Sequence, residues 1–393
     1  MSDGTLQTLD VTMLDDVGTG ANQLIQLDSN AKIPVCSGAA LTNLPGVTKN
    51  ASDPVIATNP SGGVGSVWQN TTSGNMFICT DATAGANVWT NIGAGTGDIK
   101  PAYWIAENYG YMMGGAPNPL INHIQRYPFA SSSDAVDVAN LTVARGFCCG
   151  NSSATYGYAC GGSGPTNVID KHQFGTTNNA TDVGDLVANK SDTIASSSET
   201  YGFVAGGYPS TNTIQKFSFA SDGNTTDHGD LTGTRQGGNT GGINSETHGY
   251  TSGGSGSSTQ RDKYAFASNV TAVDDGNHTA GHHGYANGCS SVINGYMVGG
   301  NVSGGGSTNI IDKFAFAAGG QSTDVGDLTQ GGYTGGHAST ADYGYKGGGG
   351  DSDQSRIEKF TFASDNNSVD TTASMLSLNG TNQSYAYGAS AQY

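Results

Sequence analysis

The chain has 393 residues, of which 62 are glycine and only 12% are charged, and its formal net charge is −17. Glycine and short polar residues are poor helix formers, and no apolar pattern with a helical period is sustained, so we expect an all-β protein. The acidity disfavours binding to nucleic acid phosphates, and no apolar run is long enough to cross a membrane as a helix, so neither nucleic acid nor membrane insertion is expected.

Residues 1–50 are predicted to form an extended N-terminal arm. Its apolar residues are too few and too local to make a core from one chain; they are Leu24, Ile25, Leu27, Ile33, Leu41 and Leu44. The segments Gly20–Asp28 and Gly38–Pro45 resemble the shaft segments of tailed-phage fibres, in which short strands from three chains wrap together. We therefore expect the arm to join three protomers in a homotrimer.

Residues 51–99 are predicted to form a small β module. The segments Gly65–Gly74, Asn75–Asp81 and Asn87–Ile92 favour a meander of three strands. Its expected core is Trp68, Phe77 and Trp89. The module resembles short Trp-containing modules of phage fibre and virion proteins, and a glycine-rich linker at 93–98 is expected to follow it.

Residues 100–393 contain an internal repeat. Its first motif is Tyr-Gly-Tyr-x-x-Gly-Gly with close variants, and successive copies are 45 to 49 residues apart, the period of a four-stranded propeller blade. The copies are Tyr109–Gly115, Tyr156–Gly162, Tyr201–Gly207, His248–Gly254, Asn294–Gly300 and Tyr343–Gly349. Six copies predict six blades.

A second motif follows in each repeat and carries two aromatic residues two positions apart. Side chains alternate along a strand, so both rings share one face; the copies are Ile124–Phe129, Ile169–Phe174, Ile214–Phe219, Arg261–Phe266, Ile311–Phe316 and Ile357–Phe362. His172 replaces the first aromatic in the second copy. One blade cannot bury such a face alone, so we expect it to pack between neighbouring blades.

Two further stretches complete the repeat. Asp-Val-Gly-Asp-Leu, at Asp182–Leu186 and Asp324–Leu328, is predicted to be the outer strand. Small residues, as in Gly237–Ser245 and Gly335–Thr340, suit the innermost strand. The C-terminal Ser384–Gly388 resembles the start of another repeat, and we expect it to complete the first blade. A seven-bladed ring and an open solenoid are the alternatives.

These residues resemble the Kelch propeller family over the region from about Tyr103 to Tyr393. The likeness lies in the aromatic strand that ends in Gly-Gly, the second aromatic strand, and a Leu-ended strand that a basic residue sometimes follows, as at Arg145, Lys190 and Arg235. The Trp that is usual in the outer strand of Kelch repeats is absent. The resemblance implies a six-bladed, Kelch-like β-propeller.

One basic residue recurs at the same position of every repeat. The column consists of Arg126, Lys171, Lys216, Lys263, Lys313 and Lys359. We hypothesise a repeated ion pair with an outer-strand carboxylate, namely Asp185, Asp230 or Asp327 in the repeats that have one.

Other residues that could bind metals have simpler interpretations, and we expect no cofactor. The six cysteines lack CxxC spacing and suit small buried side chains, although a local disulfide among Cys148, Cys149 and Cys160 is an alternative. His278, His282 and His283 could bind a metal but are more typical of a solvated loop. The turns Thr177–Asp182, Ser221–Asp227 and Ser364–Asp370 offer oxygen ligands for calcium, yet Asp, Gly and Asn are ordinary turn formers.

The loops that follow Gly-Gly vary from 6 to 10 residues and are expected to share one face of the ring. We predict that this face contacts a host surface glycan or another virion protein; the candidate residues are Pro117, Asn118, Tyr208, Pro209, Asn301 and Ser303. Solvated connections are the alternative interpretation. No motif of a hydrolase, metalloprotease or nucleotide-binding enzyme occurs, so we assign no catalytic residue and expect no enzymatic activity.

The combination of a fibre-like arm, a Trp module and a Kelch-like ring resembles virion structural proteins of marine cyanobacterial phages. It implies a tail-fibre or surface-decoration subunit that binds other virion proteins. The N-terminus lacks a secretory signal, so we expect assembly in the host cytoplasm and a final location in the virion. The alternatives are a particle-bound enzyme that degrades polysaccharide and a Kelch-like interaction scaffold.

Overall fold

The computed structural model describes residues 47–92, 108–115, 119–163, 166–237, 242–254, 259–279, 284–302, 306–333, 335–349, 355–378, 381–382 and 387–390. These residues form strands and connections with no helix, which confirms the all-β prediction. Accordingly, no helix in this part of the chain is long and apolar enough to cross a membrane. The chain divides into two compact units, Met1–Lys100 and Pro101–Tyr393. Most of the predicted arm, residues 1–46, lies outside the described residues.

The described part of the first unit, residues 47–92, forms one sheet in the order β1-β2-β3-β4. Its strands are β1 (Thr48–Asn50), β2 (Val67–Asn70), β3 (Met76–Asp81) and β4 (Val88–Asn91). The last three form the predicted antiparallel meander, and β1, from the segment assigned to the arm, adds to it in parallel. Trp68, Phe77 and Trp89 are buried with Cys79, so the predicted core is confirmed.

The second unit contains six four-stranded sheets and a two-stranded ribbon, β28 (Ser377–Leu378) with β29 (Thr381–Asn382). Each large sheet takes its strands from one repeat. Sheet II has β8 (Cys149–Ser152), β9 (Tyr156–Cys160), β10 (Val168–Gln173) and β11 (Thr181–Asp185), and sheet III has β12 (Ile194–Ser197), β13 (Tyr201–Ala205), β14 (Thr211–Ser218) and β15 (Thr226–Arg235). Sheet IV has β16 (Ile243–Asn244), β17 (His248–Ser252), β18 (Gln260–Ala265) and β19 (Val273–Asn277). Sheet V has β20 (Asn287–Ser290), β21 (Asn294–Val298), β22 (Ile310–Ala315) and β23 (Thr323–Asp327), and sheet VI has β24 (Gly336–Ser339), β25 (Tyr343–Gly347), β26 (Arg356–Thr361) and β27 (Val369–Ser374).

Sheet I differs because both ends of the repeat region contribute to it. Its strands are β30 (Tyr387–Ser390), β5 (Tyr109–Gly115), β6 (Ile121–Pro128) and β7 (Val136–Asn140). The C-terminal β30 pairs antiparallel with β5, from Tyr387 opposite Met113 to Ser390 opposite Gly110. The prediction that C-terminal residues complete the first repeat is therefore confirmed, although the strand begins a few residues later than expected.

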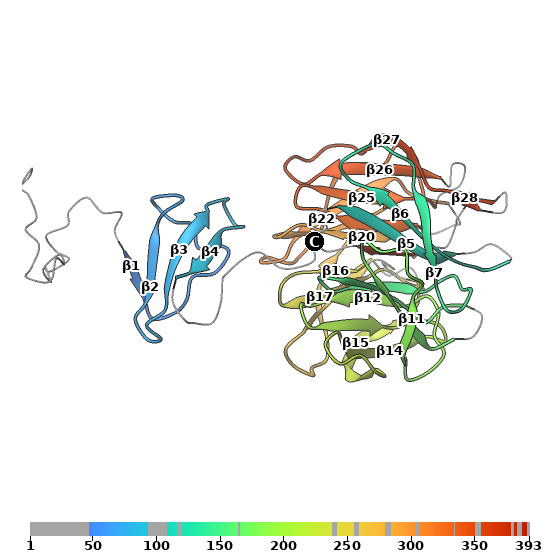
Figure 1. Cartoon of the computed structure of the whole chain (residues 1–393), viewed down its shortest axis with the longest axis horizontal. Helices are drawn as coiled ribbons and strands as arrows, with labels where there is room; N and C mark the ends of the chain where they lie inside the picture. Colours follow the sequence, from blue (N-terminus) through green and yellow to red (C-terminus); the bar gives the residue numbers. More distant parts are fainter. Residues whose placement is uncertain are drawn as a thin grey trace, which may run out of the picture. The chain divides into compact units, whose positions relative to one another are not determined.

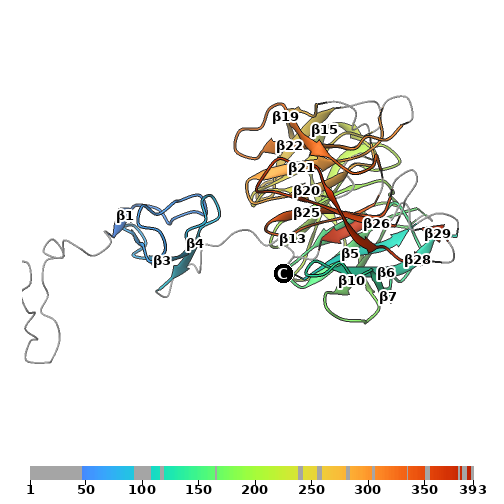
Figure 2. The same ribbon diagram turned by 90° about the horizontal axis from the view of Figure 1, so that it is seen from above.

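The six sheets follow one another in a closed series, which we call the ring. The first strand of each sheet contacts the first strand of the next, in the order β8, β12, β16, β20, β24, β30 and back to β8. As a result, β5 and β6 lie beside β25 and β26 although they come from opposite ends of the repeat region (Figures 1 and 2). The predicted innermost and outer positions of the small-residue and Asp-Val-Gly-Asp stretches are confirmed.

Aromatic side chains fill every interface between neighbouring sheets, which we call a seam. The second aromatic of the second motif packs on an aromatic residue in the second strand of the preceding sheet, with ring centroids 4.6 to 5.1 Å apart. The pairs are Phe129–Tyr345, Phe174–Tyr111, Phe219–Tyr158, Phe266–Phe203, Phe316–Tyr250 and Phe362–Tyr296. The predicted packing between repeats is confirmed at all six seams, including the closing seam between sheets VI and I.

The glycine of Tyr-Gly-Tyr is explained by the same rings. A Cβ atom added to Gly202 would lie 2.5 Å from the ring of Phe217 in its own sheet, and one added to Gly344 would lie 2.4 Å from Phe360. Glycine is thus required because an aromatic ring covers the backbone at this position.

A buried polar side chain forms a second repeated contact at each seam. It lies one residue before the basic column and accepts the N–H of a residue in the preceding sheet, at 2.8 to 3.1 Å. This donor follows the outer strand, except that Thr232 lies within the longer β15. The pairs are Gln125–Leu376, Asp170–Thr142, Gln215–Val187, Asp262–Thr232, Asp312–Thr279 and Glu358–Thr329. Such bonds fix the register of neighbouring sheets, because a buried acceptor without a partner is costly.

The hypothesis that the basic column pairs with Asp185, Asp230 or Asp327 is wrong. Lys171 lies opposite Thr181 and Asp185 lies opposite Val168, three residues along the strand, a separation of roughly 10 Å. The same offset separates Lys216 from Asp230 and Lys313 from Asp327. The cations have other partners. Lys171 and Lys313 pair with turn carboxylates of the next sheet, Asp222 and Asp365, and Lys263 lies 4.0 Å from Asp275. The remaining three lie over tyrosine rings, in the pairs Arg126–Tyr109, Lys216–Tyr201 and Lys359–Tyr343.

The cysteines of the described residues are free thiols with buried side chains. Cys149 lies directly opposite Cys160 across two strands, yet the two are not joined, so the interpretation as small buried residues holds over the disulfide alternative. Cys36 lies outside the described residues. His278 is buried against Ser322 and Asp312 rather than in a solvated loop, and His282 and His283 are not described.

Candidate functional site

One face of the ring carries the loops predicted to bind. In sheets III and V, the described part of the Gly-Gly loop lies against the connection that leads into the innermost strand of the same sheet. Tyr208 and Ser191 exchange two backbone hydrogen bonds, and the N–H of Asn301 donates to the carbonyl of Gly284 at 2.8 Å. Loops and connections therefore form one surface, which we call the connection face.

The candidate binding residues differ in their exposure. Tyr208 is 57% exposed and the neighbouring Pro209 is also exposed, so both are available to a partner. Asn301 is half-buried and its backbone bridges to Gly284 and Ser307, which indicates a role in the loop itself. Pro117, Asn118 and Ser303 lie outside the described residues.

The centre of the connection face holds a cluster that the sequence analysis did not identify. Phe147, Asp192 and Tyr285 each stand two residues before an innermost strand and adopt left-handed φ values of 56°, 55° and 54°. The ring centroids of Phe147 and Tyr285 are 6.5 Å apart. These residues enter sheets II and V, three steps apart in a series of six, so their rings meet across the centre. We call these three residues the axial cluster.

Asp192 supplies the charge of the axial cluster. Its carboxyl group accepts a hydrogen bond from the Ser191 hydroxyl at 2.7 Å, and only 8% of the residue is exposed. Burial raises the pKa of Asp192, and hydrogen bonds from Ser191 and Tyr285 oppose this effect. A buried carboxyl group beside two aromatic rings suits the binding of a polar ligand, whereas the paired carboxylates typical of glycosidases are not found in this cluster.

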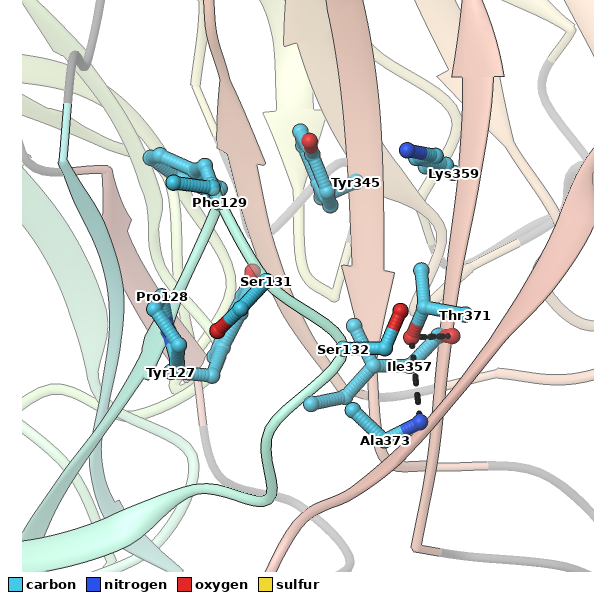
Figure 3. A pocket seen from close by; sticks show the side chains of 11 residues that line it. Tyr127, Pro128, Phe129, Ser131, Ser132, Tyr345, Ile357, Lys359, Thr371 and Ala373 are labelled. Carbon is cyan, nitrogen blue, oxygen red and sulfur yellow. Dashed lines mark hydrogen bonds between the residues drawn. The ribbon is translucent and has the colours of Figure 1, made fainter.

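Two pockets lie at the seams that flank sheet I. The pocket at the closing seam has a volume of about 180 Å³, and its lining includes Phe129, Ser132, Tyr345 and Lys359 (Figure 3). The pocket between sheets I and II has a volume of about 270 Å³ and is lined by residues such as Tyr111 and Phe174. The described lining of the closing-seam pocket includes one charged residue, Lys359, and that of the other pocket includes none.

Comparison with known proteins adds no assignment, since no family model matches the chain and no curated protein matches its sequence. Across the part of the chain that the structure describes, no three His, Cys, Asp or Glu side chains are grouped as a metal site. The turn carboxylate Asp222, considered as a calcium ligand, is instead bound to Lys171.

The sequence analysis found the loops but missed both the axial cluster and the pockets. The signal for the axial cluster is weak, because Phe, Asp and Tyr share only a position two residues before a small-residue strand. The pockets depend on which residue of one repeat faces which residue of the next, and a single repeat does not contain that information.

Proposed function

We propose that this chain is a structural subunit of a virus particle, a tail-fibre or surface-decoration protein. Its ring of six sheets is then a six-bladed, Kelch-like β-propeller that presents binding surfaces to the host or to other virion proteins. The N-terminal arm joins three such chains.

The observation that supports this proposal best is the repetition of the same two contacts at all six seams. The packed rings of Phe129 and Tyr345 and the hydrogen bond between Gln125 and Leu376 close the ring with the contacts that join its other sheets. A closed ring of sheets leaves only the short edges of its outer strands free to pair with other chains, and its loops vary without weakening the frame. These properties suit a protein that is displayed in many copies on a surface.

The second support comes from the sequence. The arm resembles fibre shafts, and the Trp module resembles those of virion proteins, so an assembly role accounts for the first hundred residues. The ring accounts for the rest, with Tyr208 and Pro209 exposed on the connection face and the axial cluster at its centre.

Two measurements test the proposal. Antibodies raised against the ring and imaged by electron microscopy on intact phage particles should label one defined position; absence of label from purified particles that contain all other structural proteins would contradict a virion role. Sedimentation of the full chain should show a trimer that becomes a monomer when residues 1–46 are deleted. Release of reducing sugar from host polysaccharide by the purified chain would favour the enzyme instead.

A further inference from the structure

The six seams can be compared residue by residue, because the turn between the third and fourth strands has one length throughout. Six residues separate the second aromatic from the residue whose N–H donates to the preceding sheet, for example Phe219 to Thr225 and Phe129 to Ala135. Asp222, Asp365 and Ser132 are therefore equivalent, each the third residue after its aromatic.

At two seams this third residue is an aspartate, and it pairs with the lysine of the basic column. The Nζ of Lys171 donates to both carboxylate oxygens of Asp222, at 3.0 and 2.8 Å, and the Nζ of Lys313 donates to one carboxylate oxygen of Asp365 across its seam. A half-buried ammonium is thus matched by a carboxylate from the next sheet.

At the closing seam the carboxylate is replaced by a hydroxyl. Ser132 stands where Asp222 and Asp365 stand, and Lys359 lies over the ring of Tyr343 at 4.9 Å. No carboxylate of the described residues lies within ion-pair distance of Lys359. The nearby Asp134 accepts the N–H of Ser374 at 2.8 Å and does not line the pocket.

The pocket of about 180 Å³ lies where the missing carboxylate would be. Figure 3 shows Phe129, Tyr345 and Lys359 along one side of it, with Ser132 and Thr371 across from Lys359. The Thr371 hydroxyl donates to the carbonyl of Ile357 at 2.7 Å, whereas the exposed Ser132 makes no hydrogen bond within the described residues. A cation, a free hydroxyl and aromatic carbon therefore surround one small space.

We propose that the closing-seam pocket binds an acidic saccharide, with the carboxylate of a hexuronate unit at Lys359. A bound carboxylate would supply the charge that Asp222 and Asp365 supply at two other seams. The pocket is smaller than the roughly 300–1,000 Å³ that encloses a drug-sized molecule, so it suits a single sugar unit of a longer chain. The biological use of this site rests on the proposed attachment function, but the site itself belongs to one chain.

A sugar fits the lining better than an acidic peptide does. A saccharide ring has an apolar face of C–H groups that packs on aromatic carbon and an edge of hydroxyls that bond to groups such as Ser132. A peptide would also need partners for its backbone N–H and C=O groups.

The test measures, by NMR titration of the full chain, its affinity for methyl glucuronide and for methyl glucoside, which has the same ring without the charge. We expect the glucuronide to bind more tightly. Lys359→Gln should weaken its binding about tenfold or more, because a charge-assisted hydrogen bond is lost. Ser132→Asp should abolish binding by filling the pocket with an ion pair like Lys171–Asp222 and Lys313–Asp365, and should leave the melting temperature equal or higher. Lys313→Gln is the matched control and should leave the affinity unchanged.

Several results would overturn the proposal: equal affinity for glucoside and glucuronide, retained binding in Ser132→Asp, or no binding of either sugar. Equal or tighter binding of a glutamate-containing peptide would assign the pocket to acidic peptides instead. Because the assay uses the isolated chain, failure here leaves the virion role standing, and failure to find the chain on particles leaves this binding result unaffected.

Discussion

The guanidinium of Arg145 lies 2.9 Å from a carboxylate oxygen of Asp170, and neither side chain is exposed to solvent. Arg145 also donates to the carbonyls of Val168 and Ala159, and Asp170 accepts from the N–H and the hydroxyl of Thr142. A buried charge is tolerated only when it is paired and hydrogen-bonded in this manner.

Other repeats match their buried charges by different routes. Arg235 and Asp262 repeat the pair between sheets III and IV. Before sheet VI, Gly332 takes the position of Arg145 and Arg235, so no arginine is present there. The buried cation is instead Lys346 on β25, which donates to the carbonyl of Gly348 at 2.8 Å. Burial lowers the pKa of Lys346 to about 8, and the buried Glu358 opposes this shift.

Sheet III has a neutral amide at the position of Asp170, and the neighbouring cation is not buried. Gln215 takes the place of Asp170, and the corresponding basic residue, Lys190, is half-exposed and donates to the carbonyl of Pro209. Asp170, Asp262 and Glu358 thus each accompany a buried cation, whereas Gln215 occurs where the cation is not buried.

We predict that Asp170→Asn destabilises the ring by about 3–5 kcal/mol, because Arg145 remains buried without its counter-charge. Denaturant unfolding of the full chain measures the change. The double variant Arg145→Met with Asp170→Gln should lose less stability than the single variant, since it reproduces the neutral arrangement of Gln215. A loss below about 1 kcal/mol for Asp170→Asn would show that the pair is not important for stability.

We predict that Gly202→Ala destabilises the ring by about 1–3 kcal/mol, because its Cβ would meet the ring of Phe217 in a filled core. Gly233→Ala is the matched control, since a Cβ at Gly233 has open space and this residue is exposed. The control should have a melting temperature equal to or slightly above that of the natural chain. Equal melting temperatures for both variants would refute the steric explanation of the repeated glycine.

The sequence predicted most of the ring because its information is periodic. Motif spacing gave the number of sheets, and the two-residue alternation placed Phe217 and Phe219 on one face, which a single repeat cannot bury. The partner of Lys171 was not predictable in the same way, since Asp222 belongs to the next repeat and the assumed partner, Asp185, to the same one. Phe147 and Tyr285 are a still harder case, because only the closed ring brings sheets II and V together.

The pairing of β30 with β5 leads to a third prediction. A chain that ends before Tyr387 would leave the edge of β5 open and remove the innermost strand of sheet I. We expect a lower melting temperature, faster hydrogen exchange in β5 and concentration-dependent association through the open edge. A chain that ends after Ser390 is the control and should behave as the full chain does. If the shorter chain keeps its melting temperature and remains unassociated, β30 does not hold the ring closed.

The buried His337 leads to a prediction about acid stability. It lies directly opposite Lys346 across β24 and β25, it is 3% exposed, and burial lowers its pKa to about 4. Between pH 4 and the ordinary histidine value of about 6.5, the unfolded chain binds a proton at this residue that the folded chain does not bind. Stability therefore rises with pH across this interval and falls on acidification, by roughly 3 kcal/mol in total at about 1.4 kcal/mol per unit.

Replacing His337 isolates its contribution to the pH dependence of stability, because other groups also titrate in the same interval. His337→Leu should flatten the dependence of the unfolding free energy on pH between 6.5 and 4 relative to the natural chain, whatever its effect at pH 7. Denaturant unfolding at half-unit steps of pH measures both curves. Parallel curves for the two proteins would mean that His337 is protonated in the folded state at its ordinary pH, and that the site beside Lys346 is open to water.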